Sequence, residues 1–380
     1  MQRICQDDYN EIFHSYQSLL NHHLKQDRES RWIRCGIQTL KLKPLVTASP
    51  LLTNPAAFAG GVSVDAIDDT VKNLGLAMRV GRDLYPVRST AYKSILDRAK
   101  IGGSVLPKLK RETLADVLNT CFAEQKSNAL VLIREEKVSA VHSGDERDYS
   151  VLPIAQLLSL LQKKLDARFP GNQFETGYSD HAVTGAFWTM PDQKKDLIGS
   201  YTDLLKAQGR LRMAEKLIPG IRFLTSDTGV ASAKVSAMLF GSDMPILIGG
   251  CVEVDHRHQR TVSDFDAALG QLVVRCGDTV KKLQELTEIH LDYPVNAMSR
   301  VCKKLSLPKK EALEAIRMFE TTNGDQPATA HDVFVAMQEI VFTLHSKKTP
   351  QSKLLTLQEN LSRAMYLDWE AYDLAKAVTY

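Results

Sequence analysis

The chain has 380 residues, of which 44% are apolar and 24% charged, and its formal net charge is +3. These values are typical of a soluble globular protein with a large core and about two or three domains. No segment approaches the roughly 18 consecutive apolar residues of a membrane-spanning helix, and the N-terminus lacks the apolar stretch of a signal peptide. Six scattered cysteines without a CxxC pair indicate reduced thiols. We therefore expect a cytoplasmic protein without a membrane partner.

The first third of the chain predicts a helix, an extended arm and a basic stretch. Apolar residues recur at helical spacing over 6–24, which predicts a helix there. The segment 31–64 is interrupted by Pro, Thr and Gly, and it predicts short strands or an extended arm. We expect mixed helix and loop over the basic stretch 72–111, ahead of a helix that starts at Thr113.

The middle of the chain predicts an antiparallel sheet with flanking helices. A hairpin is expected over 129–141 with Glu135 and Glu136 in its turn. A helix follows from Pro153, which suits a first helical turn, and another is expected over 194–208. Candidate strands cover 173–178, 182–190, 221–224, 231–239 and 246–254. The fold class predicted by this order is α+β with a largely antiparallel central sheet.

From Ser263 onward the pattern is wholly helical. Thr329 and Asp332 resemble a capping box before one of these helices, and Pro350 begins a last helix that is expected to reach about Ala377. We therefore expect three regions. They are an N-terminal helix with the basic stretch (1–110), an α+β core domain (111–260) and an all-helical C-terminal region (261–380).

The basic stretch 72–111 carries most of the charge asymmetry. It holds ten basic and two acidic residues, so its net charge is +8 and the rest of the chain sums to −5. Lysine and arginine contact phosphates without reading sequence, and Tyr85 and Tyr92 within the stretch could stack on unpaired bases. The competing interpretation is a solvated face that the acidic remainder neutralises.

The segment 251–260 ends a predicted strand and has three interpretations. It could be a polar strand end that caps a helix. Arg257 and Arg260 could instead bind phosphate. Finally, His256 and His258 share one face of a strand and could ligate a metal with further His or Glu ligands.

Two other polar segments follow predicted strands. The turn 224–229 offers hydroxyl and backbone N–H groups for an anion or a metal, although Asp and Gly there also suit an ordinary turn. Asp180 beside His181 could orient an imidazole as a general base. The chain has no Walker-type loop, no GxGxxG and no GxSxG, so no reaction is indicated.

Five short segments together resemble a known family. They are Leu114–Asn119, Lys137–Ser143, Tyr149–Pro153, Leu224–Gly229 and Asp255–His258. In this order they resemble the phage- and plasmid-borne family of unknown function that includes the YfjQ/YafZ proteins, over about residues 110–345. The resemblance implies a mobile-element setting and assigns no catalytic residues.

We therefore expect a non-enzymatic nucleic-acid-binding protein of a phage or plasmid that binds, anneals or protects single-stranded DNA, acts in a homo-oligomer and needs no cofactor or metal. The expected contacts are cations and tyrosines of the basic stretch with two later arginines: Arg79, Arg82, Tyr85, Arg88, Tyr92, Lys93, Lys108, Lys110, Arg111, Arg257 and Arg260. The alternative is a protein-interaction factor that inhibits or modulates a host defence complex through its helical C-terminal third. A metal-dependent enzyme that uses His256 and His258, with His181, is the third hypothesis.

Overall fold

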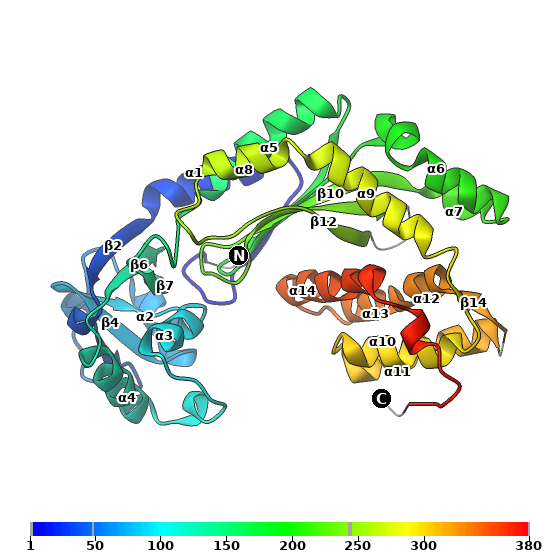
Figure 1. Ribbon diagram of the computed structural model, residues 1–380. Coiled ribbons are helices and arrows are strands. Elements are labelled where there is room, and N and C mark those ends of the chain that lie inside the picture. The colour runs from blue at the N-terminus through cyan, green and yellow to red at the C-terminus, as the bar shows by residue number, and fades with distance from the viewer. Residues whose placement is uncertain (1–2, 48, 242–244, 325, 379–380) are drawn as a thin grey trace.

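The computed structural model describes residues 3–47, 49–241, 245–324 and 326–378 and has the expected α+β fold (Figure 1). Its centre is a six-stranded antiparallel sheet with the order β1-β8-β9-β10-β11-β12. The strands are β1 (Asn10–Phe13), β8 (Gln173–Asp180), β9 (Thr184–Thr189), β10 (Ile218–Thr225), β11 (Ala233–Phe240) and β12 (Ile246–Val254). The five strands expected in the middle of the chain are confirmed, and β1 joins them from near the N-terminus.

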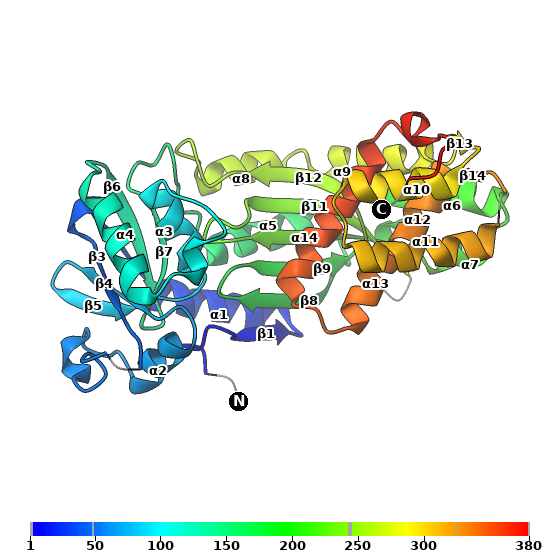
Figure 2. The same cartoon turned by 90° about the horizontal axis from the view of Figure 1, so that it is seen from below.

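Helices cover both faces of this sheet. One face packs against α1 (Tyr16–Glu29), α5 (Ile154–Arg168), α6 (Lys194–Ala207), α8 (Val262–Leu269) and α9 (Leu272–Glu285). Because side chains alternate along a strand, Trp188 lies in this core while Phe187 lies on the opposite face. There α14 (Gln351–Ser362) crosses the strands, as Figure 2 shows. Leu355 of α14 packs in the same cluster as Phe187, and the fully buried Arg222 pairs with Glu359 of α14 at 3.0 Å.

Residues 31–143 form an N-terminal lobe at one end of the sheet (Figure 1). It contains two three-stranded antiparallel sheets, β2 (Arg31–Gly36) with β6 (Asn128–Arg134) and β7 (Lys137–Ser143), and β3 (Lys41–Pro44) with β4 (Leu76–Val80) and β5 (Asp83–Pro86). Its helices are α2 (Val64–Lys72), α3 (Ala91–Ala99) and α4 (Arg111–Ala123). One apolar core joins the two sheets and includes residues of both α3 and α4. The boundary expected at residue 110 therefore does not separate two cores.

The expected hairpin of β6 and β7 is confirmed. Its turn residues Glu135 and Glu136 have φ values of +48° and +72°, which two-residue hairpin turns require and which glycine or asparagine normally supply. Glu136 is held there because its carboxylate accepts hydrogen bonds from the N–H and hydroxyl of Ser63 at 2.8 and 2.6 Å. Contacts of the side chains thus compensate for a backbone conformation that glutamate adopts reluctantly.

The chain after β12 is mainly helical, as predicted, but it also contains a short antiparallel pair, β13 (His290–Leu291) with β14 (Ala328–Thr329). Its last part contains α10 (Pro294–Lys304), α11 (Lys309–Asn323), α12 (Ala330–Met337), α13 (Glu339–Ser346) and α14, and these helices lie on the side of the sheet opposite α5, α8 and α9 (Figure 1). The capping box of Thr329 and Asp332 is present at the start of α12. Their core is continuous with that of the sheet, so residue 261 also marks no break between cores. Within the described ranges, no helix has the length and apolarity that spanning a membrane would require.

Two expected helices differ from the structure. The segment 6–24 begins with β1 instead of a helix, because residues 10–13 pair with 177–180 of β8 across the sequence. Helical spacing in a short apolar window does not reveal such a distant partner. The last helix ends at Ser362, where the chain continues as a short 3₁₀ turn over Arg363–Tyr366.

His331 in α12 predicts a dependence of stability on pH. It is fully buried, and its Nδ1 accepts a hydrogen bond from Arg210 at 2.9 Å while its Nε2 contacts the hydroxyl of Tyr201 at 2.7 Å. Burial, with the neighbouring Arg210, lowers the pKa of His331 to about 4. His331 is therefore protonated near pH 6.5 in the unfolded chain but only near pH 4 in the folded protein.

We expect the free energy of unfolding to fall by up to about 3 kcal/mol from His331 alone as the pH falls from about 6.5 to 4. Urea unfolding at a series of pH values measures this dependence. The variant His331→Gln keeps polar partners for Tyr201 and Arg210 but removes the titrating group, so its stability should fall less. An equally steep loss in this variant would contradict the assignment.

Candidate functional site

An open pocket of about 690 Å³ lies where the N-terminal lobe meets one end of the six-stranded sheet. Five segments line it: α3, the end of β7, the loop 144–150, the turn between β10 and β11, and the loop after β12. Three segments that are far apart in the sequence meet here, namely the end of Lys137–Ser143, the turn 224–229 and the segment 255–258.

Three stacked rings form one wall of the pocket. The rings of His142 and Tyr149 are nearly parallel with centroids 3.5 Å apart, and Tyr149 stacks on His256 at 5.7 Å. Each of the three side chains is less than a tenth exposed. Trp32 of β2 flanks the stack, with its ring 6.1 Å from that of His142. The stack therefore connects the lobe to the loop after β12.

Asp227 fixes the orientation of two of these rings. Its backbone carbonyl accepts hydrogen bonds from His142 Nε2 at 2.9 Å and from the Tyr149 hydroxyl at 2.7 Å. Burial lowers the pKa of His142 to about 4 and raises the pKa of Tyr149. Both rings are therefore uncharged near neutral pH, which lets them remain stacked in a buried position.

Gly229 lies in the same turn between β10 and β11 as Asp227. Its φ is +75°, a region that residues with a side chain avoid. A Cβ built there would lie only 3.2 Å from Cε1 of His142. Both the backbone conformation and the close approach of the imidazole thus favour glycine at this position.

The two loops beside the ring stack are bound to each other through their backbones. The N–H of His258 donates to the carbonyl of Arg147 at 2.8 Å, and the N–H of Ser150 donates to the carbonyl of His256 at 2.8 Å. His258 has a φ of +58°, so the chain turns sharply at this point. As a result, loops more than a hundred residues apart in sequence present their side chains to one pocket.

Cationic side chains surround the pocket. Lys93 and Arg98 come from α3, Arg147 from the loop 144–150, and Arg257 from the loop after β12. The acidic side chains in the lining are Asp97, Asp148 and Asp255. A second pocket of about 770 Å³ shares Arg98, Ser143 and Asp148 with the first and adds Arg34, Lys100 and Lys126. Guanidinium groups from several directions can bind phosphate oxygens in a bidentate manner.

The structure distributes the eleven predicted contacts over several places. Lys93 and Arg257 lie in the pocket. Arg79 and Arg82 belong to the β4–β5 hairpin, and Lys108, Lys110 and Arg111 lie at or just before the start of α4. Tyr92 is half-buried on α3, and Arg260 is exposed and pairs with Asp264 at 3.0 Å.

Two of the expected contacts are corrected because their side chains are buried. Arg88 has no exposed surface, and its guanidinium lies 3.3 Å from the carboxylate of Glu135. Tyr85 is 2% exposed, and its hydroxyl accepts a hydrogen bond from Arg31 at 3.0 Å. Neither side chain can reach a phosphate or a base in this arrangement. The sequence of the basic stretch gave no indication of which basic residues face inward.

The expected contacts did not include Arg98 and Arg147, which line the pocket. Arg98 belongs to the basic stretch, where counting charges marks it only as one cation among ten. Arg147 stands in a segment with three acidic neighbours, Asp145, Glu146 and Asp148, so local charge conceals it. Its place in the pocket depends on the loop-to-loop hydrogen bonds, which have no sequence pattern.

The alternative metal and general-base interpretations find no matching geometry. His256 is buried with Nδ1 3.2 Å from the carbonyl of Ser150, whereas His258 is exposed, so they do not share a face. Asp180 binds Tyr178 and the N–H groups of residues 182 and 183 and does not contact His181. In the part of the chain that the structure describes, no three His, Cys, Asp or Glu side chains are placed to hold a metal ion.

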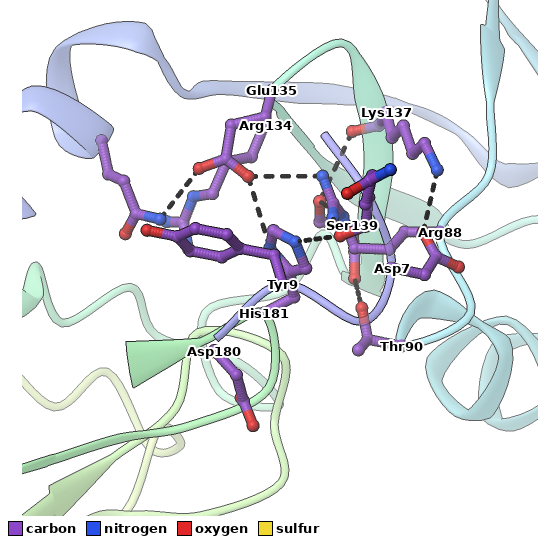
Figure 3. Close-up of polar contacts among 12 residues, drawn as sticks. Asp7, Tyr9, Arg88, Thr90, Arg134, Glu135, Lys137, Ser139, Asp180 and His181 are labelled. Atoms are coloured by element: carbon purple, nitrogen blue, oxygen red, sulfur yellow. Dashed lines mark hydrogen bonds and ion pairs between the residues drawn. The ribbon is translucent and has the colours of Figure 1, made fainter. Parts of the chain in front are cut away.

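A buried ionic cluster lies around the β6–β7 turn (Figure 3). We use this name for Asp7, Asp69, Arg88, Glu135, Lys137 and His181. Glu135 contacts both Arg88 and His181 Nδ1 at 3.3 Å, and Lys137 binds both aspartates. The cluster joins the β6–β7 turn of the lobe to the N-terminal segment and to the loop after β8.

Arg134 connects this cluster to the pocket. It precedes Glu135 in the chain, and its guanidinium forms a buried ion pair with the carboxylate of Asp227. Its Nε donates to the hydroxyl of Ser30 at 2.8 Å. Asp227 thus binds the lobe through its side chain while its carbonyl holds the ring stack of the pocket.

Comparisons of this chain with protein-family models, with curated proteins and with solved structures gave no match.

Proposed function

We propose that the protein binds single-stranded nucleic acid, with this pocket as the place where phosphates are held. The observation that supports the proposal is the convergence of Lys93, Arg98, Arg147 and Arg257 from three separate segments on one polar pocket. A pocket of about 690 Å³ suits a nucleotide or an extended single strand. The ring stack is buried, so we assign it to holding the loops and not to stacking on bases.

The proposal also extends the binding surface along the lobe. Arg98 lines both pockets, and Lys100 and Lys126 continue the cationic lining in the second pocket. The strand would then follow α3 toward Lys108 and Lys110, both exposed. A phage or plasmid protein that covers or anneals single strands would use such sequence-independent contacts.

The first experiment is fluorescence anisotropy with a labelled single strand of about 40 nucleotides and with its duplex, each at roughly 50 and 200 mM salt. The proposal predicts tighter binding of the single strand and a steep loss of affinity at the higher salt concentration. No binding to either molecule at low salt would overturn it and would direct attention to a protein partner, such as a component of a host defence complex.

Removing three arginines of the pocket tests where the phosphates bind. In the variant Arg98→Ala/Arg147→Ala/Arg257→Ala, we expect single-strand affinity to fall at least about tenfold, with a log–log salt slope shallower by about 2, since each lost phosphate contact removes roughly 0.7. The matched control is Lys304→Ala/Lys309→Ala/Lys310→Ala, which removes the same charge from exposed positions on α10 and α11. Equal losses in both variants would show that only the total charge matters.

A further inference from the structure

Two buried cysteines face each other between the six-stranded sheet and α9. The sulfur atoms of Cys251 in β12 and Cys276 in α9 are 3.3 Å apart. Cys251 is 1% exposed and Cys276 is 6% exposed. The two cysteines are 25 positions apart in the sequence. Neither of them lines the pocket.

The position of Cys251 follows from an irregularity in β12. On the neighbouring strand β11, Val235 pairs with Val252 and Ser236 pairs with Gly250, so Cys251 has no residue directly opposite. An extra residue of this kind bends a strand and redirects a side chain. Here the thiol of Cys251 meets α9, against which β12 packs.

The position of Cys276 follows from the buried face of α9. Leu272, Cys276, Thr279, Val280 and Leu283 are the buried residues of this helix and recur at helical spacing. The guanidinium of the preceding residue, Arg275, donates to the backbone carbonyl of Cys251 at 3.3 Å. The two thiols are therefore held together by packing and by a hydrogen bond between their elements.

We propose that Cys251 and Cys276 form a redox-active dithiol that a peroxide oxidises to a disulfide. A disulfide requires the sulfurs to approach to about 2.05 Å, so the pair has to close by roughly 1 Å. The contact with Cys276 and the nearby Arg275 lower the pKa of Cys251, whereas the same contact and burial raise the pKa of Cys276. These directions make Cys251 the sulfur that reacts first.

The reaction proceeds in two steps. The Cys251 thiolate attacks one oxygen of hydrogen peroxide, so an S–O bond forms, the O–O bond breaks, and the leaving hydroxide takes a proton to become water. The Cys276 sulfur, after losing its proton, attacks the sulfenic sulfur, so the S–S bond forms and the S–O bond breaks with release of a second water. Two electrons pass from the thiols to the peroxide.

The disulfide would close a loop that contains the pocket-lining segment 255–258 and α8. Closing a loop of this length restricts the unfolded chain, and we expect the melting temperature of the oxidised protein to rise by about 5 °C. The rise should reverse when dithiothreitol reduces the bond. The other four cysteines, Cys5, Cys35, Cys121 and Cys302, serve as internal references.

The test treats the folded full-length protein with hydrogen peroxide, blocks remaining thiols with N-ethylmaleimide and maps the peptides by mass spectrometry. The proposal predicts a peptide pair linked through Cys251 and Cys276 and the reversible rise in melting temperature. The variant Cys251→Ser should lose both, while Cys302→Ser should keep both. Detection of the link only after the protein is unfolded, or oxidation confined to other cysteines, would overturn the proposal. Because peptide mapping uses the unmodified chain, the test does not depend on the folding of a variant.

Discussion

Replacing Lys137 by methionine is expected to lower the free energy of unfolding by about 3–5 kcal/mol. The ammonium group of Lys137 is fully buried and binds the carboxylates of both Asp7, at 2.9 Å, and Asp69. Methionine fills a similar volume but leaves two buried or half-buried carboxylates beside each other without a cation. The destabilisation comes from those uncompensated charges more than from lost packing.

Urea unfolding at neutral pH measures this effect, and two variants provide controls. Lys206→Met removes an exposed lysine that pairs with Asp203 at 3.0 Å, and it should cost less than about 1 kcal/mol. Lys137→Met/Asp7→Asn/Asp69→Asn removes the stranded charges and should recover part of the lost stability. A triple variant that is less stable than Lys137→Met would contradict the electrostatic explanation.

The difference in the free energy of unfolding between the wild type and Lys137→Met should become smaller at acidic pH. Burial raises the pKa of Asp7, but Lys137 and hydrogen bonds from Ser89 outweigh it, so the pKa lies below its ordinary value. A carboxyl group whose pKa is lower in the folded protein than in the unfolded chain stabilises the fold above about pH 4, the pKa in the unfolded chain. This stabilisation is lost as the pH falls through the pKa of the folded protein. The stability gap should therefore narrow below about pH 4. A difference in stability that does not change with pH would indicate that lost packing, and not charge, destabilises the variant.

Replacing Asp227 by asparagine is expected to cost about 3 kcal/mol of stability and to weaken single-strand binding as well. Asparagine preserves the shape of the side chain but leaves the Arg134 guanidinium, in a side chain only 7% exposed, without its counter-charge. The turn that carries Asp227 also holds His142 and Tyr149 through its carbonyl. A shift of this turn therefore moves the loops that carry Arg147 and Arg257.

The two effects of Asp227→Asn are measured by urea unfolding and by the anisotropy assay. Asp203→Asn, in an exposed ion pair, is the control for the change of charge. Val333→Ala, in the buried core of α12, is the control for lost stability far from the pocket. If Val333→Ala weakens binding as much as Asp227→Asn at equal stability, the link between the turn and the pocket is wrong.

The local elements were predictable where the sequence pattern is itself local. The β6–β7 hairpin, the helix after Pro153 and the capping box at Thr329 each depend on residues within one element. The edge strand β1 was not predictable, because its pairing partner lies about 165 residues later. Propensity within a short window cannot identify such a partner.

The candidate site was predictable only in part for the same reason. The turn 224–229 and the segment 255–258 were recognisable as polar strand ends, but their meeting with α3 depends on how the lobe docks. Charge counting over the basic stretch could not show that Lys93 lines the pocket while Arg88 pairs with Glu135 in the interior. Glu135 and Glu136 in a two-residue turn are typical of an exposed hairpin. In the structure, however, both carboxylates bind residues that are distant in sequence, Arg88 and Ser63.

The way the chain passes through the N-terminal lobe limits how the lobe can move. The chain enters at Arg31, which pairs with Ile133, and leaves at Ser143, which pairs with Ala129, so the two crossings lie at opposite ends of the β2–β6–β7 sheet. Because Ile133 and Ala129 are four residues apart on β6, these points are roughly 17 Å apart. A rigid body attached at two fixed points can rotate only about the line that joins them. The two chain crossings therefore permit a rotation about this line, with the Ser30–Arg134 hydrogen bond beside one hinge and the pocket beside the other, and the buried ion pair of Arg134 with Asp227 opposes that rotation.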